Sequence, residues 1–282
     1  MAFPLVGVIA PAHVISQISQ AAARLGVQIK SSTETMSAEE LSNFGADCKL
    51  LCIEPDLIST AAIRSAESAG VVIYPSSKLL DAVATIELST TSGEQLAILS
   101  ARSAHAQSVI WPISLINNDL VITPAPGVSE EQAITIAVSN LNLLAELALT
   151  GAVELLVDAN DYQKLLKINW LQPISAFATQ INSVTDYYEQ YLRAVLDLPL
   201  GDSGSSKSYT VTGFLKTDPQ SDDYRPYLHL MARNPDLKFH QYKKEIRKGR
   251  KVGHVTVVGE NLLELTEVIA HARDYMSGEI DE

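Results

Sequence analysis

The sequence is poor in cysteine, with only Cys48 and Cys52 among 282 residues. In a β-strand, residues four apart lie roughly 13 Å apart at about 3.3 Å per residue. That separation is too large for a disulfide, whose Cα atoms lie within about 7 Å of each other. Two thiols alone also make a poor metal site. We therefore expect two core thiols in a protein of the reducing cytoplasm.

Long apolar runs are absent as well, since none reaches the roughly 18 residues that a membrane-spanning helix needs. The sequence also has no glycine-rich phosphate-binding loop. Its formal net charge of -12 repels nucleic acids and anionic membranes away from any local basic patch. We therefore expect no membrane partner and no nucleic-acid partner.

The first ninety residues alternate between short apolar runs and helical patterns. Gly26 is a helix stop signal, and Ser76 and Ser77 offer an N-cap to the last of the helices. Alternation of this kind predicts βαβ units and a parallel sheet over residues 1–87. The predicted strands are 4–9, 27–30, 49–53 and 71–74, and the predicted helices are 12–25, 38–44, 55–69 and 76–86.

A polar linker, LSTTSG at 88–93, separates this unit from a different pattern. A Gly/Ser-rich break at 201–206 divides the rest, so we predict domains at 94–200 and 207–282. The first should contain strands 95–101, 108–115, 153–157 and 164–168 with helices 130–149 and 186–196. The second should contain strands 209–215, 237–242 and 252–258 with helices 225–231 and 261–276.

The segment 238–258 reads KFHQYKKEIRKGRKVGHVTVV. It resembles the closing segment of the 5-(carboxyamino)imidazole ribonucleotide synthase family, which belongs to the ATP-grasp superfamily. The resemblance rests on His240, Tyr242, Lys244, Glu245, Arg247, Gly249, Arg250, Lys251, Gly253 and His254. Segments 188–202, 96–102 and 124–131 and the Trp111-Pro112 pair also agree in order. The resemblance implies an α/β fold with a pre-ATP-grasp domain, an ATP-grasp domain and a small C-terminal α+β domain.

Several parts that the family uses to hold ATP have no counterpart here. The lid and its lysines should fall in the interval that the linker 88–93 occupies, so we expect a reduced ATP-grasp domain without a lid. Of the acidic metal ligands, only Glu154 matches, because residues 167–173 (KINWLQP) contain no carboxylate. Residues 174–179 (ISAFAT) replace a polar substrate-binding stretch. We therefore expect no catalytic residue and no cofactor, with Glu154 as a weak metal remnant.

One basic segment remains, because residues 238–251 hold seven of the 21 lysines and arginines and a single acid. The resemblance implies that Lys244 and Arg250 contact the phosphate of a ribonucleotide, and Arg247 and Lys251 are further candidates. Arginine offers a planar fork to phosphate oxygens and lysine a point charge. The structural alternative is a solvated hairpin without a ligand.

Several ring side chains are predicted to pack and not to react. His254 should hold its strand, and Trp170 and Phe177 should fill a disused site. The remaining members of this group are His240, Tyr242, Tyr187, Tyr188 and Tyr191.

These observations favour a catalytically degenerate relative of the synthase. It would bind a phosphorylated ligand, a ribonucleotide or a partner protein in connection with purine biosynthesis. The first alternative is a minimal or split ATP-dependent synthase that carboxylates aminoimidazole ribonucleotide and uses MgATP. The second alternative is a purely structural or interaction protein. The family resemblance also implies a homodimer.

Overall fold

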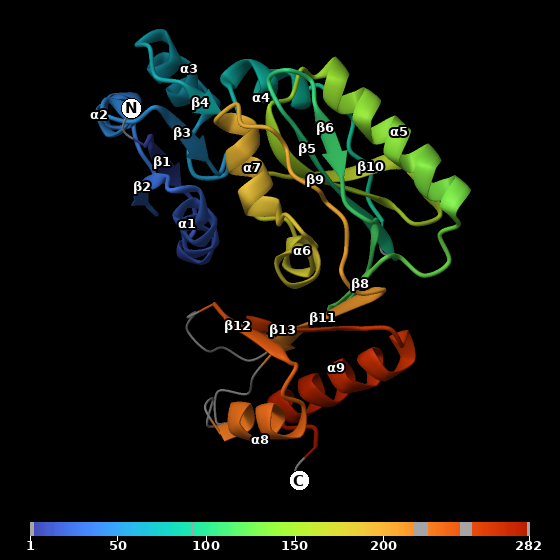
Figure 1. Ribbon diagram of the computed structural model, residues 1–282. Helices are drawn as coiled ribbons and strands as arrows, with labels where there is room; N and C mark the ends of the chain where they lie inside the picture. Colours follow the sequence, from blue (N-terminus) through green and yellow to red (C-terminus); the bar gives the residue numbers. More distant parts are fainter. Residues whose placement is uncertain (1–2, 92, 217–224, 243–249, 281–282) are drawn as a thin grey trace.

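The computed structural model describes residues 3–91, 93–216, 225–242 and 250–280. Its N-terminal part is a parallel sheet, as the sequence predicts, and the strand order is β2-β1-β3-β4 (Figure 1). The strands are β1 (Leu5–Ile9), β2 (Gln28–Ser32), β3 (Leu50–Ile53) and β4 (Ile73–Tyr74). The helices are α1 (Ala12–Leu25), α2 (Ala38–Gly45), α3 (Thr60–Ser68) and α4 (Ser77–Val83).

Local capping explains where these helices begin and end. Gly26 ends α1 in the left-handed conformation, with φ of 70°, which glycine adopts without steric cost. Helix α3 begins at Thr60 and not at residue 55 as predicted. The Ser59 hydroxyl accepts a hydrogen bond from the Ala62 amide and so fixes the start of the helix there.

The second sheet has nine strands in the order β10-β9-β5-β7-β8-β11-β13-β12, with β6 paired to β5. Its strands are β5 (Gln95–Arg102), β6 (Ser108–Ile110), β7 (Ser114–Asn117), β8 (Leu120–Thr123), β9 (Gly151–Asp158), β10 (Asp161–Asn169), β11 (Tyr209–Lys216), β12 (Lys238–Gln241) and β13 (Lys251–Gly259). Its helices are α5 (Glu130–Glu146), α6 (Ala176–Asn182), α7 (Tyr187–Val195), α8 (Arg225–Arg233) and α9 (Leu262–Ser277).

One prediction for this region is wrong, and two elements were missed. The single strand expected at 108–115 is two strands, β6 and β7, interrupted at Trp111-Pro112, where the proline cannot donate to a ladder. Strand β8 and helix α6 were not predicted at all. Strand β8 matters because it pairs with β11, with Thr123 opposite Thr210, so the predicted units 94–200 and 207–282 share one sheet. The predicted domain boundaries stay a prediction.

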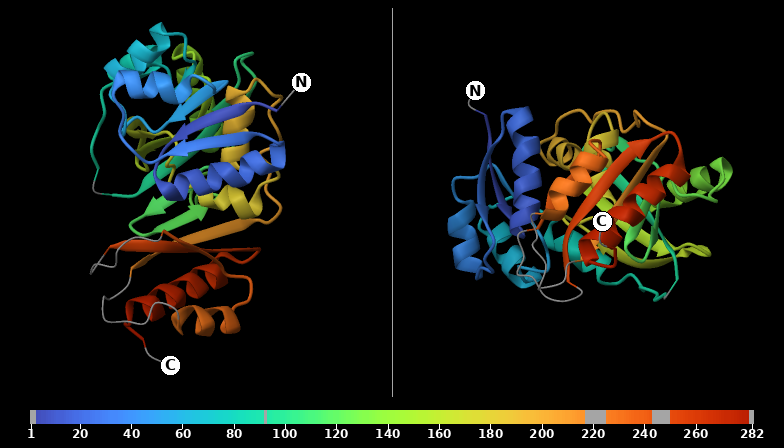
Figure 2. Two further views of the ribbon diagram at one scale, coloured as in Figure 1. Left: turned by 90° about the vertical axis from the view of Figure 1, so that its left-hand side faces the viewer. Right: turned by 90° about the horizontal axis from the view of Figure 1, so that it is seen from below.

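Helix α7 lies between the two sheets and ties them together (Figure 1). It packs against α1 on one side and against β9 and β5 on the other. Helix α5 lies beside the same sheet, away from α7, and α8 and α9 lie beneath the β11–β13 end (Figures 1 and 2). No described residue between Val83 and Gln95 belongs to a helix or strand.

Both cysteines carry free thiols, and Cys52 is buried in β3. Within the described part of the chain, no helix has the length and apolar character needed to cross a membrane.

Candidate functional site

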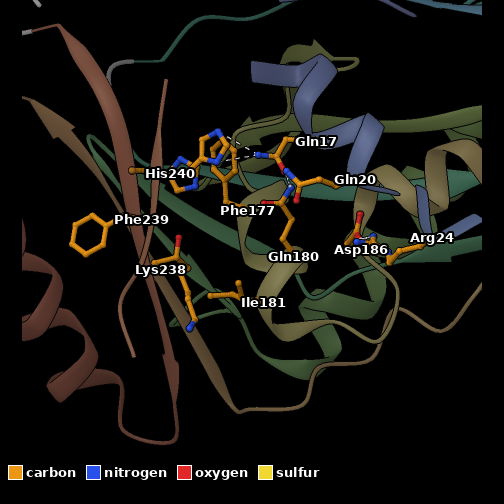
Figure 3. Close-up of a pocket in the computed structure, with 12 residues that line it drawn as sticks. Gln17, Gln20, Arg24, Phe177, Gln180, Ile181, Asp186, Lys238, Phe239 and His240 are labelled. Atoms are coloured by element: carbon orange, nitrogen blue, oxygen red, sulfur yellow. Dashed lines mark hydrogen bonds and ion pairs between the residues drawn. The ribbon is translucent and has the colours of Figure 1, made fainter. Parts of the chain in front are cut away.

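A pocket of about 250 Å³ lies where α1, α6, β12 and β13 converge (Figure 3). Three glutamines line it, Gln17 and Gln20 from α1 and Gln180 from α6. The rings of Phe177, His240 and His254 also line it. The pocket therefore joins the N-terminal unit to the segment that carries the family resemblance.

The ring side chains form a stack at the inner end of this pocket. The His254 ring centroid lies 3.7 Å from that of Phe177 and 5.1 Å from that of His240. The Tyr242 hydroxyl is 3.0 Å from His254 Nδ1. Burial, together with the nearby imidazoles of His240 and His13, lowers the pKa of His254 well below its usual value. His254 is therefore neutral and holds its strand, in agreement with the sequence-based prediction.

A chain of amide hydrogen bonds completes the inner wall. Gln180 Nε2 donates to Gln17 Oε1 at 2.6 Å. Gln17 Nε2 lies 3.0 Å from Nδ1 and 3.2 Å from Nε2 of His240. Dashed lines in Figure 3 mark these interactions. Burial lowers the pKa of His240, so its ring is neutral and can accept this hydrogen bond. The inner wall is polar but uncharged.

Charge is found only at the rim of the pocket. Lys238 is exposed, and Arg24 forms ion pairs with Asp186 and Glu189. A neutral lining of amides and rings is suited to a planar, hydrogen-bonding ligand. Among the lining residues, the Lys238 ammonium at the rim has no ion-pair partner within the described part of the chain and is available to an anionic group.

The structure describes two of the four predicted phosphate ligands, Arg250 and Lys251. Lys244 and Arg247 lie outside the described residues, and Arg250 is exposed next to β13. Lys251 Nζ lies 3.0 Å from Asp119 Oδ1 and 4.0 Å from the Phe214 ring centroid. Lys251 is therefore engaged by a carboxylate on the turn between β7 and β8.

Asp119 forms ion pairs with three cationic side chains, those of Lys251, Lys216 and Arg273. Burial alone would raise the pKa of Asp119, but the hydrogen bonds from Lys216 and Lys251 outweigh it and lower that pKa. This ion-pair cluster links β11, β13 and α9 to the β7–β8 turn.

Glu154, the predicted metal remnant, is fully buried in β9. Its Oε1 accepts from the Ser175 amide at 2.7 Å and the Ser175 hydroxyl at 2.6 Å. Its Oε2 accepts from Asn169 Nδ2 at 2.6 Å and the Ile174 amide at 2.9 Å. Each of the two oxygens already accepts two hydrogen bonds. These four bonds use the whole acceptor capacity of a carboxylate.

Mg²⁺ in nucleotide sites is held by free carboxylate oxygens together with substrate phosphates. The hydrogen bonds to Glu154 leave no such oxygen, and no group of three His, Cys, Asp or Glu side chains suited to a metal exists in the described ranges. The residues of this chain therefore do not fit a magnesium site at Glu154. The carboxylate instead anchors the start of α6.

Phe177 and Trp170 were predicted to fill the same disused site, but they belong to different clusters. Phe177 is buried with Leu156 and Phe214 on one face of the sheet. Trp170 is half-buried and packs with the cluster that includes residues of α5. Tyr187, Tyr188 and Tyr191 are all buried, as expected for packing residues.

Glu54 is a residue of interest that the sequence reasoning missed. It follows β3 directly, is 4% exposed, and its Oε2 has no hydrogen-bond partner among the described residues. Burial raises the pKa of Glu54 to about 7, against a smaller opposing effect of the Gln172 side chain. The available signal was an acid at the carboxyl end of an apolar parallel strand, where ligand sites of open α/β sheets lie.

Comparison with known proteins gives the family. Residues 207–268 match the phosphoribosylaminoimidazole carboxylase C-terminal domain. The N5-carboxyaminoimidazole ribonucleotide synthase of Mycobacterium tuberculosis is 35% identical over 212 residues, covering 71% of this chain and 49% of that protein. That of Corynebacterium ammoniagenes is 34% identical over 183 residues, covering 59% and 44%. This chain belongs to the N5-carboxyaminoimidazole ribonucleotide synthase family.

Solved structures of the family share the fold. The Thermus thermophilus synthetase superposes with a TM-score of 0.80 at 17% identity, covering 98% of this chain and 99% of that one. The Aspergillus clavatus synthase, in complex with ADP and 5-aminoimidazole ribonucleotide, gives a TM-score of 0.80 at 16% identity, covering 99% and 100%. At such low identity, these superpositions establish the fold alone.

The chain spans about half the length of the curated synthases it matches. These relatives are named as synthases, so the comparisons favour the ATP-dependent synthase alternative over the non-catalytic interpretation. The domain match at 207–268 includes β12 and β13, the two strands that line the candidate pocket.

Proposed function

We propose that this protein acts in the ATP-dependent carboxylation of aminoimidazole ribonucleotide, as the ribonucleotide-binding part of a split synthase. The observation that carries the proposal is the 35% identity to a synthase over 212 residues, together with the family match at 207–268, which includes the strands β12 and β13 that line the candidate pocket. The neutral amide and ring lining suits the heterocycle of such a ligand, and the basic segment 238–251 begins at the pocket rim with Lys238.

The split arrangement follows from Glu154. A carboxylate that accepts four hydrogen bonds inside the core is not available to a metal ion. In this proposal a second chain supplies the residues that hold MgATP. The present chain contributes the ribonucleotide contacts of Lys244 and Arg250, whose charges match a phosphate.

The direct test is turnover. Purified protein is supplied with MgATP, bicarbonate and aminoimidazole ribonucleotide, and ADP release is followed, first alone and then with fractions of the source cells. The proposal predicts no turnover by the chain alone and ribonucleotide-dependent ADP release when the second chain is present. Failure to bind aminoimidazole ribonucleotide under any of these conditions would contradict it.

Variants make the test specific. Changing Lys244 and Arg250 together to Ala should weaken ribonucleotide binding by at least tenfold, because two charge-assisted phosphate contacts are lost. Lys49 and Lys164 are exposed lysines outside the basic segment, and their double change to Ala serves as the matched control. Equal loss in both double variants would indicate a general charge effect and count against the assignment.

A second candidate function is a non-catalytic binding protein of the same family. The Glu154 carboxylate favours this function, because its hydrogen bonds within the chain stabilise it without a metal ion or a second chain. It predicts ribonucleotide binding that never leads to ADP release, with or without a second chain. Complementation of a bacterial strain that lacks its own synthase separates the two, since only a functional split enzyme can restore growth without purines. The homodimer and the cytoplasmic location stay predictions.

A further inference from the structure

A second pocket of about 200 Å³ is lined by residues of α5 and of the strands β5, β9 and β10. Figure 1 shows α5 lying along this sheet. The inner walls of the pocket are apolar and come from three strands and the helix. They comprise Ile98 of β5, Leu155 and Val157 of β9, Leu165 of β10, and Ile136 and Leu143 of α5, and the half-buried Tyr162 of β10 also lines the pocket. Ser139 and Gln163 also line it and are exposed, so they mark its mouth.

This pocket is separate from the candidate site described above. Successive residues of a strand point to opposite faces of a sheet. Leu155 lines this pocket, while its neighbour Glu154 points to the other face and binds Ser175 at the start of α6. This second pocket shares no lining residue with the candidate pocket between α1, α6, β12 and β13.

One buried polar residue, Asn140 of α5, is among the residues that line this pocket. It is 4% exposed. Its Oδ1 accepts a hydrogen bond of 2.8 Å from the Ser100 hydroxyl, and Ser100 does not line the pocket. Its Nδ2 is buried and has no hydrogen-bond partner in the described part of the chain. A buried donor without an acceptor destabilises the fold, and such groups in native proteins call for an explanation.

We propose that this pocket is a binding site for a small heteroaromatic molecule that carries one hydrogen-bond acceptor. The apolar walls would contact the ring, and Asn140 Nδ2 would donate to the acceptor atom. An apolar cavity of roughly 150 Å³ holds benzene, so a pocket of this size accommodates one or two fused rings. The Ser100 hydroxyl fixes the amide so that its donor, and not its acceptor, meets the ligand.

The test uses ring compounds of nearly the same shape. Quinoline carries one acceptor nitrogen, naphthalene carries no polar atom, and indole carries an N–H donor. Isothermal titration of the full-length protein should give a quinoline Kd about tenfold lower than that of naphthalene, with indole weaker than quinoline. Equal affinity, a preference for indole, or no binding of any of the three up to its own solubility limit would overturn the proposal, the last because water alone would then occupy the pocket.

Two variants localise the site. Asn140→Leu removes the donor, so the preference for quinoline over naphthalene should disappear while naphthalene still binds. Leu143→Trp fills the pocket, so both compounds should lose binding. Asn142→Leu, at an exposed position of the same helix, is the matched control and should leave all three affinities unchanged. Retention of the quinoline preference in Asn140→Leu would contradict the assignment. The ligand series on the unmodified protein decides the matter if that variant does not fold.

Discussion

The buried carboxyl of Glu54 makes the stability of this protein depend on pH in a way that a single substitution can reveal. Burial raises the pKa of Glu54 from its ordinary 4.5 to about 7. The folded protein therefore binds this proton more tightly than the unfolded chain does. The stabilisation that results is complete below about pH 4.5 and is lost as the pH rises through about 7. We predict that Glu54→Gln, which cannot ionise, escapes this loss.

The magnitude follows from the two pKa values. One pH unit corresponds to about 1.4 kcal/mol, so ionising Glu54 in the folded protein costs about 3 kcal/mol above pH 7. At pH 5 most of the folded protein keeps the proton, and the cost is below about 1 kcal/mol. The free energy of unfolding of Glu54→Gln, minus that of the wild type, should therefore grow by about 2 kcal/mol between pH 5 and pH 8.

Urea denaturation of both proteins at the two pH values measures this difference. Other titrating groups, such as His240 and His254, cancel because they are present in both proteins. Glu34→Gln provides the control, because Glu34 is exposed and its substitution should give the same small difference at both pH values. A difference for Glu54→Gln that is constant with pH, or that favours the wild type at pH 8, would refute the reasoning.

Four further substitutions test the packing and hydrogen bonds of the fold by the same urea denaturation. Phe177→Ala should lower the free energy of unfolding by about 3 kcal/mol. Trp170→Ala should lower it by less, because Trp170 is only half-buried. The reverse order would contradict the assignment of the two residues to different environments. Glu154→Ala should cost about 3 kcal/mol or more, because the buried donors of Asn169 and Ser175 lose their acceptor, and a neutral effect would mean that Glu154 is not structural. Ser37→Ala should cost about 1 kcal/mol by removing the capping box of α2, which an unchanged denaturation midpoint would disprove.

Elements with strong local signals could be predicted from the sequence, and elements without them could not. The predicted helix at 12–25 coincides with α1, because its apolar periodicity and the stop at Gly26 are both local. Strand β8 was missed because it is four residues long and is set by the turn before it, where Asn118 has φ of 52°. Helix α6 was missed because its seven residues are mostly buried and show no polar face.

The candidate site depends more heavily on contacts between distant residues. Lys251 was expected at a phosphate, but Asp119, which is far away in the sequence, engages it. The raised pKa of Glu54 comes from burial in the folded chain, so the sequence around Glu54 could not reveal it. The structural role of His254 was anticipated, because its place at the start of an apolar strand indicates a residue that holds the strand.

The central claim is that this chain binds the ribonucleotide but cannot hold MgATP by itself. Thermal unfolding of the purified protein with each ligand tests it most directly. At about 100 times its Kd, aminoimidazole ribonucleotide should stabilise the fold by roughly 2.7 kcal/mol, while MgATP alone should leave the unfolding temperature unchanged. Stabilisation by MgATP without any response to the ribonucleotide would contradict the account.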